Sequence, residues 1–407
     1  MVRSATRDGV RDRRSVGAAG RPARGTRWAG VAAALLALLV VGAAALWHAP
    51  QASAHTVAKG LWDDTFVGVA PAKQNAILTE IADQLHVSTV RLMVFWARAE
   101  PAQGVFDEGY LGQLKTAVDA ARAHGLRVIL TTYEVPKWAS DSALWKSPPP
   151  GFGFKKNSYY YFYAPRANAL PDFQAFAQHV AEELSGEVFA YEVWNEANLF
   201  WFLYPQRTAN DPYVGVRSYL GMLKAFSAGI RAGDPNALVL AGNTASQGIN
   251  NTRTTSPIRW ALWLRKNHVL NYCDAYSHHV YALGGSGPIR SPEQPPRYPA
   301  WTVVLGNIRT LLRVFPHTDF YLTEWGYNSQ DSKLFGGGGV GEKMQAAYLT
   351  RGFKLADRYP QIKLLTWYLR VDVKAGRSVF SPPMTTGLRR VNGSKKPAWF
   401  AFARLHR

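Results

Sequence analysis

Two stretches, Tyr191–Asn198 (YEVWNEAN) and Phe320–Ser329 (FYLTEWGYNS), decide how the chain is interpreted. Each begins with apolar, β-branched and aromatic residues and then turns polar, which is typical of a buried strand that presents side chains at its C-terminal end. The first stretch carries Glu196 and the second carries Glu324. Two carboxyl groups from two strands are what glycosidic bond cleavage requires, because one protonates the leaving oxygen and the other attacks the sugar.

Outward from these stretches, short apolar strands alternate with helical patterns eight times. We expect strands at residues 65–70, 89–94, 127–133, 188–194, 237–242, 274–281, 320–324 and 364–369. Helical periodicity predicts helices at residues 73–85, 111–124, 172–184, 217–232, 258–267, 302–314, 342–359 and 398–405. Such alternation predicts a parallel sheet. Eight repeats without a glycine-rich phosphate loop after the first strand favour a single-domain (β/α)₈ barrel over an open doubly wound sheet.

The N-terminal segment differs in kind from the rest. Residues 1–28 form a basic leader with eight arginines and two aspartates, and residues 29–47 carry no charge. The uncharged segment fits either a membrane anchor or the core of a signal peptide. Residues 48–60 read as a linker, with a small-residue pattern that suits cleavage after Ala54. Because the arginines would stay in the cytoplasm, both alternatives export the catalytic domain, residues 61–407, either tethered to the membrane or secreted.

Composition narrows the classes of function. The single cysteine, Cys273, excludes an internal disulfide. The formal net charge is +19, and removing the leader's eight arginines and two aspartates leaves +13. This surplus suits an anionic polysaccharide or an envelope surface. A solvated basic surface explains it equally well. We do not expect nucleic acid as a partner, because no recognisable binding motif accompanies the charge.

Aromatic residues gather in two loops that would follow the third and fourth strands. The loop residues are Trp138, Trp145, Phe152, Phe154 and 159–163, followed by 200–202 and Tyr204. In a (β/α)₈ barrel the loops after the strands carry the active site. Flat apolar rings there can contact the C–H faces of sugars, although about half of them are expected to pack the loops together. Trp138 is the one that we assign to substrate binding.

The chain resembles the clan A glycoside hydrolases, which are retaining (β/α)₈ enzymes, and is nearest in character to families 39 and 5. The resemblance covers the whole predicted barrel and rests on six motifs: VRLMVFWARAEP (90–101), VPKWAS (135–140), YEVWNEAN, DAYSHHVY (274–281), FYLTEWG (320–326) and TWY (366–368). Together these motifs are specific for the clan and not for a substrate. Family 39 xylosidases usually carry a sandwich domain beyond the barrel, and we expect no such domain from the sequence that follows the eighth predicted strand.

The resemblance implies roles for individual residues. Glu196 would be the general acid/base and Glu324 the nucleophile. Arg91 would place a cation near Glu324, and Tyr281 would donate a hydrogen bond to it. The remaining substrate contacts would be Asn195 on the sugar 2-hydroxyl, His279 lining the cleft and Trp367 stacking under the sugar. A charged residue inside a strand needs a partner, which makes Arg91 the best supported of these contacts.

His278 and His279 are adjacent on a predicted strand, so they point to opposite faces and cannot share one metal ion. We expect one to line the cleft, with His279 matching the clan's H-x-Y pattern, and the other to be packed. The sequence shows no metal site, phosphate loop or nucleotide fingerprint, and the mechanism requires no cofactor.

These observations predict an exported retaining glycoside hydrolase that cleaves a β-linked polysaccharide internally. Two alternatives stay open. A transglycosylase would use the same two glutamates and pass the glycosyl group to another sugar. A non-catalytic carbohydrate-binding barrel would not need both carboxylates, which the chain retains.

Overall fold

The computed structural model describes residues 55–141, 160–282, 288–331, 338–374 and 384–405. The predicted leader, the uncharged segment and the linker up to residue 54 lie outside these residues. From His55 onward the chain forms one compact unit. Among the helices of this unit, none combines the length and the hydropathy that crossing a bilayer would require.

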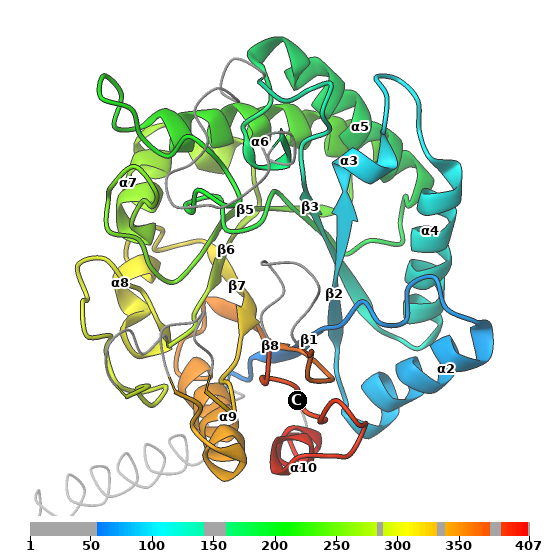
Figure 1. Cartoon of the computed structure of the whole chain (residues 1–407), viewed down its shortest axis with the longest axis vertical. Helices are drawn as coiled ribbons and strands as arrows, with labels where there is room; N and C mark the ends of the chain where they lie inside the picture. The colour runs from blue at the N-terminus through cyan, green and yellow to red at the C-terminus, as the bar shows by residue number, and fades with distance from the viewer. Residues whose placement is uncertain (1–54, 142–159, 283–287, 332–337, 375–383, 406–407) are drawn as a thin grey trace, which may run out of the picture. The chain divides into compact units, whose positions relative to one another are not determined.

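Eight parallel strands close into a barrel in chain order, and β8 pairs with β1, which confirms the predicted (β/α)₈ fold. The strands are β1 Ala58–Trp62, β2 Thr89–Phe95, β3 Arg127–Tyr133, β4 Ala190–Glu192, β5 Leu238–Thr244, β6 Ala275–His279, β7 Asp319–Trp325 and β8 Ile362–Tyr368. The ring of strands lies inside a ring of helices (Figure 1). This arrangement brings the C-terminal ends of all eight strands to one mouth.

Each strand is followed along the chain by one or two of the outer helices. They are α2 Pro71–Thr79, α3 Trp96–Ala99, α4 Glu108–Ala123, α5 Leu170–Glu183, α6 Val214–Gly233, α7 Pro257–Lys266, α8 Arg309–Leu312, α9 Glu342–Ala356 and α10 Pro397–Ala403. A π-helical turn, η1 Glu80–Gln84, extends α2, and short 3₁₀ turns occur at Tyr160–Phe162, Ala167–Ala169, Val269–Asn271 and Leu305–Asn307 (η6). The helix expected at 172–184 begins two residues earlier, where Pro171 occupies the first turn.

The barrel interior has an apolar lower layer and a polar upper layer. Six buried residues from six strands form the lower layer: Ile129, Ala190, Leu240, Ala275, Tyr321 and Leu364. Because these strands surround the barrel, residues from six of them can pack together only inside it. The polar layer contains Arg91, Thr131, Glu192 and Thr323, which are all at most 1% exposed. The candidate site is built on this polar layer.

The predicted first strand is wrong. Residues 65–68 form a turn, in which the Asp63 side chain accepts a hydrogen bond from Thr65 N at 2.9 Å. The strand lies earlier, at Ala58–Trp62, so the barrel includes three residues that the sequence assigned to the linker. The charged Lys59 interrupts the apolar pattern of this strand, so no strand was expected here. Its Nζ donates to the carbonyl groups of Phe402 and Leu405 at 2.9 and 2.6 Å, which compensates the burial of the charge.

The helix predicted at residues 302–314 is also broken. Only η6 and the four-residue α8 form there. The Asn307 side chain accepts from Val304 N at 2.8 Å and donates to the Thr302 carbonyl at 2.9 Å. Asparagine side chains compete with the helix for backbone hydrogen bonds in this way. The segment before η6 therefore stays free to pair with the loop after β5.

Candidate active site

The two glutamates reach the barrel mouth by different routes. Glu324 lies on β7, whereas Glu196 lies in the loop four residues beyond the end of β4. In this loop both Trp194 (φ 68°) and Glu196 (φ 40°) have left-handed backbone conformations. Each costs on the order of 1–3 kcal/mol and persists only where the surroundings hold it. Here Trp194 Nε1 donates to the Phe202 carbonyl at 2.6 Å, and Asn243 Nδ2 donates to the Trp194 carbonyl.

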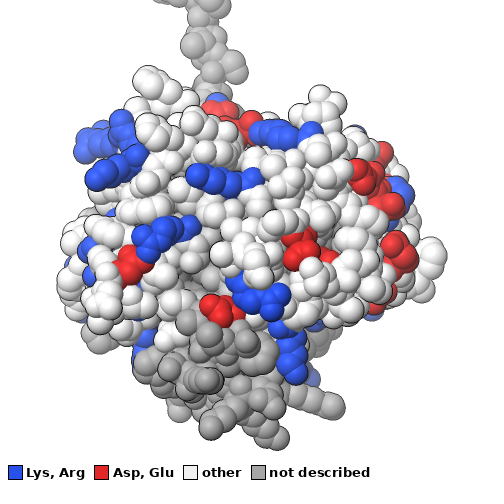
Figure 2. Space-filling model, turned by 90° about the horizontal axis from the view of Figure 1, so that it is seen from above, with Lys and Arg blue, Asp and Glu red and all other residues white. Residues whose placement is uncertain are grey.

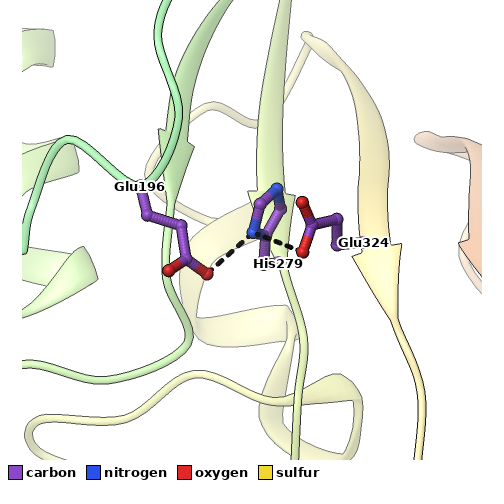
Figure 3. Close-up of side chains that lie close together, drawn as sticks. All are labelled: Glu196, His279 and Glu324. Atoms are coloured by element: carbon purple, nitrogen blue, oxygen red, sulfur yellow. Dashed lines mark hydrogen bonds and ion pairs between the residues drawn. The ribbon is translucent and has the colours of Figure 1, made fainter. Parts of the chain in front are cut away.

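The two carboxyl groups face one another across His279. His279 Nδ1 lies 2.8 Å from Glu196 Oε1 and 3.6 Å from Glu324 Oε2, and the carboxyl oxygens of the two glutamates come within 4.8 Å (Figure 3). The side chains of Glu196 and Glu324 are 15% and 12% exposed. A reacting atom can therefore contact both oxygens while most of the surrounding water is excluded.

Both oxygens of Glu324 accept hydrogen bonds. Arg91 Nη1 donates to Oε1 at 2.5 Å, and the Tyr281 hydroxyl donates to Oε2 at 2.9 Å. Burial raises the pKa of Tyr281 well above its ordinary value, and the adjacent Glu324 raises it further, so the hydroxyl keeps its proton. The positions predicted for Arg91 and Tyr281 beside Glu324 are those found in the structure.

Glu196 has a different environment. Burial raises the pKa of its carboxyl from 4.5 to about 7, although the positive charge of Arg91 opposes this rise. A carboxyl group with such a pKa is protonated in a large fraction of molecules at neutral pH. It can therefore donate a proton to a leaving group, while its neighbour Glu324 is positioned as an acceptor.

His279 stays neutral in this site. Burial lowers its pKa to about 4, although Glu324 acts in the opposite direction. Its Nε2 is buried without a hydrogen-bond partner among the described residues, and its Nδ1 faces Glu196. The ring proton is best placed on Nδ1, where an acceptor is available. His278 is the packed histidine, because its two nitrogens contact Thr244 Oγ1 and the Val303 carbonyl.

Glu192 belongs to the site although no sequence motif assigned it a role. This fully buried carboxylate on β4 accepts from Arg91 Nε at 2.7 Å, Thr131 Oγ1 at 2.6 Å and Thr323 Oγ1 at 2.7 Å. Burial alone would raise its pKa, but the positive charge of Arg91 and the two threonine hydrogen bonds outweigh this effect and lower the pKa. A charge inside a strand needs a partner, so the position of Glu192 within a predicted strand was a signal of the same kind as that of Arg91.

Arg91 thus joins the polar layer to the mouth of the barrel. Its guanidinium lies between the carboxylates of Glu192 and Glu324, and its Nη2 donates to Asn195 Oδ1 at 3.0 Å. Burial would lower the pKa of this guanidinium, but the two carboxylates raise it. The Asn195 amide oxygen is therefore occupied, and its NH₂ group remains as the donor for a ligand.

The prediction that Trp367 stacks under a sugar is wrong. Trp367 is fully buried, its Nε1 donates to the Thr386 carbonyl at 2.9 Å, and its ring packs edge-on against Trp325 at 5.1 Å. The next residue, Tyr368, is half-buried, and its ring lies 5.1 Å from Trp62 and 6.1 Å from Tyr281. Successive side chains of a strand point to opposite faces, so Tyr368 occupies the place that was expected for Trp367.

Trp138 packs within the loops of the barrel. Its Nε1 donates to the Glu100 carbonyl at 3.0 Å, and its ring packs edge-on against Trp96 at 5.6 Å. These contacts identify it as a loop-packing residue and give no support to the sugar contact that was predicted. The predicted aromatic positions Trp145, Phe152, Phe154 and Tyr159 lie outside the described residues.

The side chains of Glu196, His279 and Glu324 could also hold a cation, because each offers a ligand atom and these atoms lie within 4.8 Å of one another. However, Glu324 already accepts a hydrogen bond from the Arg91 guanidinium, which compensates its charge. The different environments of the two glutamates correspond to a proton donor beside a nucleophile. The arrangement therefore fits acid/base chemistry better than metal binding.

Comparison with known proteins agrees with this chemistry. A sequence model described as cellulase, glycosyl hydrolase family 5, matches residues 53–369. No curated protein sequence matches the chain. A solved family 39 glycoside hydrolase from Bacteroides cellulosilyticus WH2 is similar, with 18% identity, 86% of this chain and 63% of that chain covered, and a TM-score of 0.58.

Two further solved structures have the same fold. An exo-β-1,4-mannosidase from Opitutaceae bacterium strain TAV5 has 16% identity and a TM-score of 0.57, with 88% of this chain and 60% of that chain covered. A GH5_18 protein from Streptomyces cattleya, solved with GlcNAc, has 16% identity and a TM-score of 0.59, with 86% and 80% covered. The chain spans less than two thirds of the first two structures. At these identities the similarity concerns the fold.

Proposed function

The protein chain belongs to glycosyl hydrolase family 5. From this membership we propose that it cleaves internal glycosidic bonds of a β-linked polysaccharide, with retention of anomeric configuration. The observation that carries this proposal is the facing pair of Glu196 and Glu324, whose oxygens come within 4.8 Å. Retaining enzymes hold their carboxyl groups about 5–5.5 Å apart, whereas inverting enzymes leave about 6.5–9.5 Å for a water molecule. The narrow gap favours retention.

In the first step Glu324 attacks the anomeric carbon while Glu196 gives its proton to the departing oxygen. The bond from the anomeric carbon to the leaving group breaks, and a covalent glycosyl–enzyme forms. In the second step Glu196, now a carboxylate, takes a proton from water, and the water oxygen displaces Glu324. Arg91 and Tyr281 hold the nucleophile in one orientation through the whole sequence.

The sugar in the cleavage site would contact three further groups. The Asn195 NH₂ group is positioned to donate to the sugar 2-hydroxyl, because its amide oxygen is bound to Arg91. His279, between the two carboxyl groups, fixes the orientation of Glu196. Tyr368, in place of Trp367, provides the aromatic wall at the end of β8. Such contacts contribute most when they strengthen in the transition state.

Azide rescue of two alanine variants tests the roles of the glutamates. Glu196→Ala should still form its glycosyl–enzyme from an activated nitrophenyl glycoside, because that leaving group needs no proton, and should then stall without the base. Azide should restore turnover and give the β-glycosyl azide. On an unactivated glycan the same variant should lose roughly 10²–10⁴-fold.

Glu324→Ala is the matched comparison, because it removes the nucleophile and should fail on both substrates. If azide rescues Glu324→Ala instead, with inverted product, the two roles are exchanged. If neither variant loses activity, the catalytic pair lies elsewhere. Sizing the products on a glycan panel then separates internal hydrolysis from transglycosylation, which would yield products longer than the substrate.

The location of the enzyme forms part of the proposal. Export of the barrel, by an anchor or a cleaved signal peptide, is supported by the basic leader and the uncharged segment at residues 29–47. Fractionation of cells that make the full-length chain tests it. Protein in the membrane fraction would establish the anchor, a soluble exported form beginning at His55 would establish cleavage, and cytoplasmic protein would refute export.

A further inference from the structure

Two exposed aromatic rings lie on a loop at the mouth of the barrel. Tyr298 and Trp301 are 55% and 41% exposed, their ring centroids are 6.0 Å apart, and their planes are tilted by 30°. They occupy the two ends of a proline-containing turn, Tyr298-Pro299-Ala300-Trp301, in which Trp301 N donates to the Tyr298 carbonyl at 3.1 Å. The turn holds both rings side by side in water, which is costly for apolar surface unless a ligand covers it.

Backbone pairing connects this turn to the loop that carries Glu196. Gly248 N donates to the Trp301 carbonyl at 3.0 Å, and Gln247 pairs with Thr302, so the turn lies against the loop after β5. That loop in turn pairs with the loop after β4, through Leu199 and Thr254. Two successive backbone pairings therefore connect the aromatic turn to the Glu196 loop.

A buried side chain makes this connection rigid. Asn198, two residues after Glu196, donates through Nδ2 to the carbonyl groups of Gln247 and Thr255 at 3.2 and 2.9 Å, and its Oδ1 accepts from Ala245 N at 2.7 Å. Asn198 is fully buried. The hydrogen bonds of Asn198 therefore hold the loops after β4 and β5 together. The aromatic turn is paired through its backbone with the loop after β5.

We propose that Tyr298 and Trp301 form a sugar-binding platform for the leaving-group side of the polysaccharide. This inference rests on the proposed function. Glu196 donates its proton to the leaving oxygen, so the sugars that depart extend past the Glu196 loop, toward the loops that pair with it. Sugar rings present apolar C–H faces, and two adjacent aromatic faces match consecutive sugars of an extended chain. The occupant is thus a β-linked glycan several residues long.

The test compares substrates that reach the platform with one that does not. Trp301→Ala and the double variant with Tyr298→Ala are compared with Phe400→Ala, a control that removes a similarly exposed ring (46%) on α10. The substrates are hydroxyethyl cellulose, β-1,4-xylan and β-1,4-mannan, oligosaccharides of two to six residues from each, and nitrophenyl β-glycosides.

The double variant should lose roughly ten-fold in kcat/KM on the polysaccharide that the enzyme cleaves, and the loss should grow with chain length. Its kcat/KM on the nitrophenyl glycoside should stay within two-fold, since that leaving group is too short to reach the turn. Phe400→Ala should behave as the wild type on every substrate. Equal losses on long and short substrates, or no loss on the polysaccharide, would overturn the proposal.

Affinity electrophoresis in gels containing each polysaccharide separates this proposal from the proposed function. If the wild type cleaves no glycan but is retarded in a gel, and Trp301→Ala abolishes the retardation, the platform stands and the hydrolase assignment fails. If the wild type cleaves a glycan and the variants retain full chain-length dependence, the hydrolase stands and the platform fails. A dimer that Trp301→Ala dissociates, with unchanged chain-length dependence, would show instead that the rings form a subunit interface.

Discussion

At the scale of single residues, the two glutamates differ because their surroundings differ. Glu196 is largely buried, and its oxygen Oε1 lies beside a neutral imidazole. Glu324 accepts from a guanidinium and a phenol. Under the proposed mechanism, the same type of side chain would serve as the acid in one place and as the nucleophile in the other, and the different surroundings would separate the two tasks near neutral pH.

The raised pKa of Glu196 predicts the alkaline limb of the pH profile. The carboxyl must be protonated to act as the acid, so kcat/KM on an oligosaccharide should fall about ten-fold per pH unit above about pH 7. The nitrophenolate of a nitrophenyl glycoside leaves without this proton. The kcat/KM for that substrate should therefore decline little in the same pH range. Steady-state kinetics on both substrates between pH 4 and 9 measures the contrast. An oligosaccharide limb near pH 4.5 would contradict the proposed environment of Glu196.

Glu192→Gln tests whether Glu192 tunes the site through Arg91. Without the Glu192 charge, the positive field of Arg91 is no longer balanced, and the pKa of Glu196 should fall. The alkaline limb should then move to lower pH, by roughly half a unit to one unit. Thr323→Val is the control, because it removes a hydrogen bond to Glu192 and leaves the charge in place. A lower melting temperature in both variants with no movement of the limb would mean that Glu192 is only structural.

Substitution of adjacent residues on β8 distinguishes the two faces of the strand. Tyr368→Ala removes the aromatic wall of the mouth and should lower kcat/KM on a nitrophenyl glycoside by about ten-fold. Trp367→Phe alters the packing behind the strand and removes the hydrogen bond to the Thr386 carbonyl, so it should lower the melting temperature and leave kcat/KM within two-fold. Thermal unfolding and steady-state kinetics of both variants test this expectation. A large loss of kcat/KM in Trp367→Phe with little loss in Tyr368→Ala would identify Trp367 as the sugar contact.

At the scale of elements, a buried lysine couples the first strand to the last helix. Lys59 on β1 donates to two carbonyl groups at the C-terminal end of α10 and lies 4.7 Å from the Phe402 ring centroid. A cation at a helix C-terminus satisfies carbonyl groups that lack partners within the helix and interacts favourably with the helix dipole. This contact ties the end of the chain to the beginning of the barrel.

Lys59→Met should therefore destabilise the barrel. The loss of one buried and one partly buried hydrogen bond to carbonyl groups should lower the free energy of unfolding by about 2–3 kcal/mol. Lys363→Met, on another barrel strand, is the matched control. It removes an exposed ion pair with Asp319 and an exposed hydrogen bond to the Pro360 carbonyl, and should cost less than about 1 kcal/mol. Denaturant unfolding measures both. Equal stability of the two variants would show that the Lys59 contacts contribute nothing.

At the scale of the whole molecule, the basic side chains are dispersed on the face that Figure 2 shows. Figure 2 shows Lys and Arg side chains spread over this face, with acidic groups between them. The leader aside, the chain carries a net charge of +13. Dispersed positive charge of this kind provides general attraction to a polyanion.

This distribution predicts that binding to acidic polysaccharide depends on salt. Exposed charges are screened beyond about 8–10 Å at ordinary ionic strength, so the affinity should fall steadily between about 0.01 and 0.5 M salt. Affinity measurements with an acidic glycan and a neutral glycan of equal length provide the comparison. Equal, salt-independent binding of both would show that the charge surplus does not act on the substrate.

The sequence by itself determined the order of strands and helices, the closed barrel and the positions of Glu196, Glu324, Arg91, Asn195, His279 and Tyr281 in the site. Apolar periodicity predicted the elements, and the motifs identified these residues. It misplaced β1, because a search for apolar strands passes over a strand that contains a buried lysine. The partners of Lys59 are more than 340 residues away, so no local pattern announces them.

Only the tertiary structure decided which neighbouring side chain enters the mouth and which charges meet inside the barrel. Trp367 and Tyr368 are adjacent in the sequence. In the closed barrel the Trp367 side chain points outward and the Tyr368 side chain points into the mouth. Glu192 acquired its role from Arg91 and Thr323, which lie 101 and 131 residues away. Strand alternation is local, but the direction of each face and the compensation of a buried charge depend on the strands that close the ring.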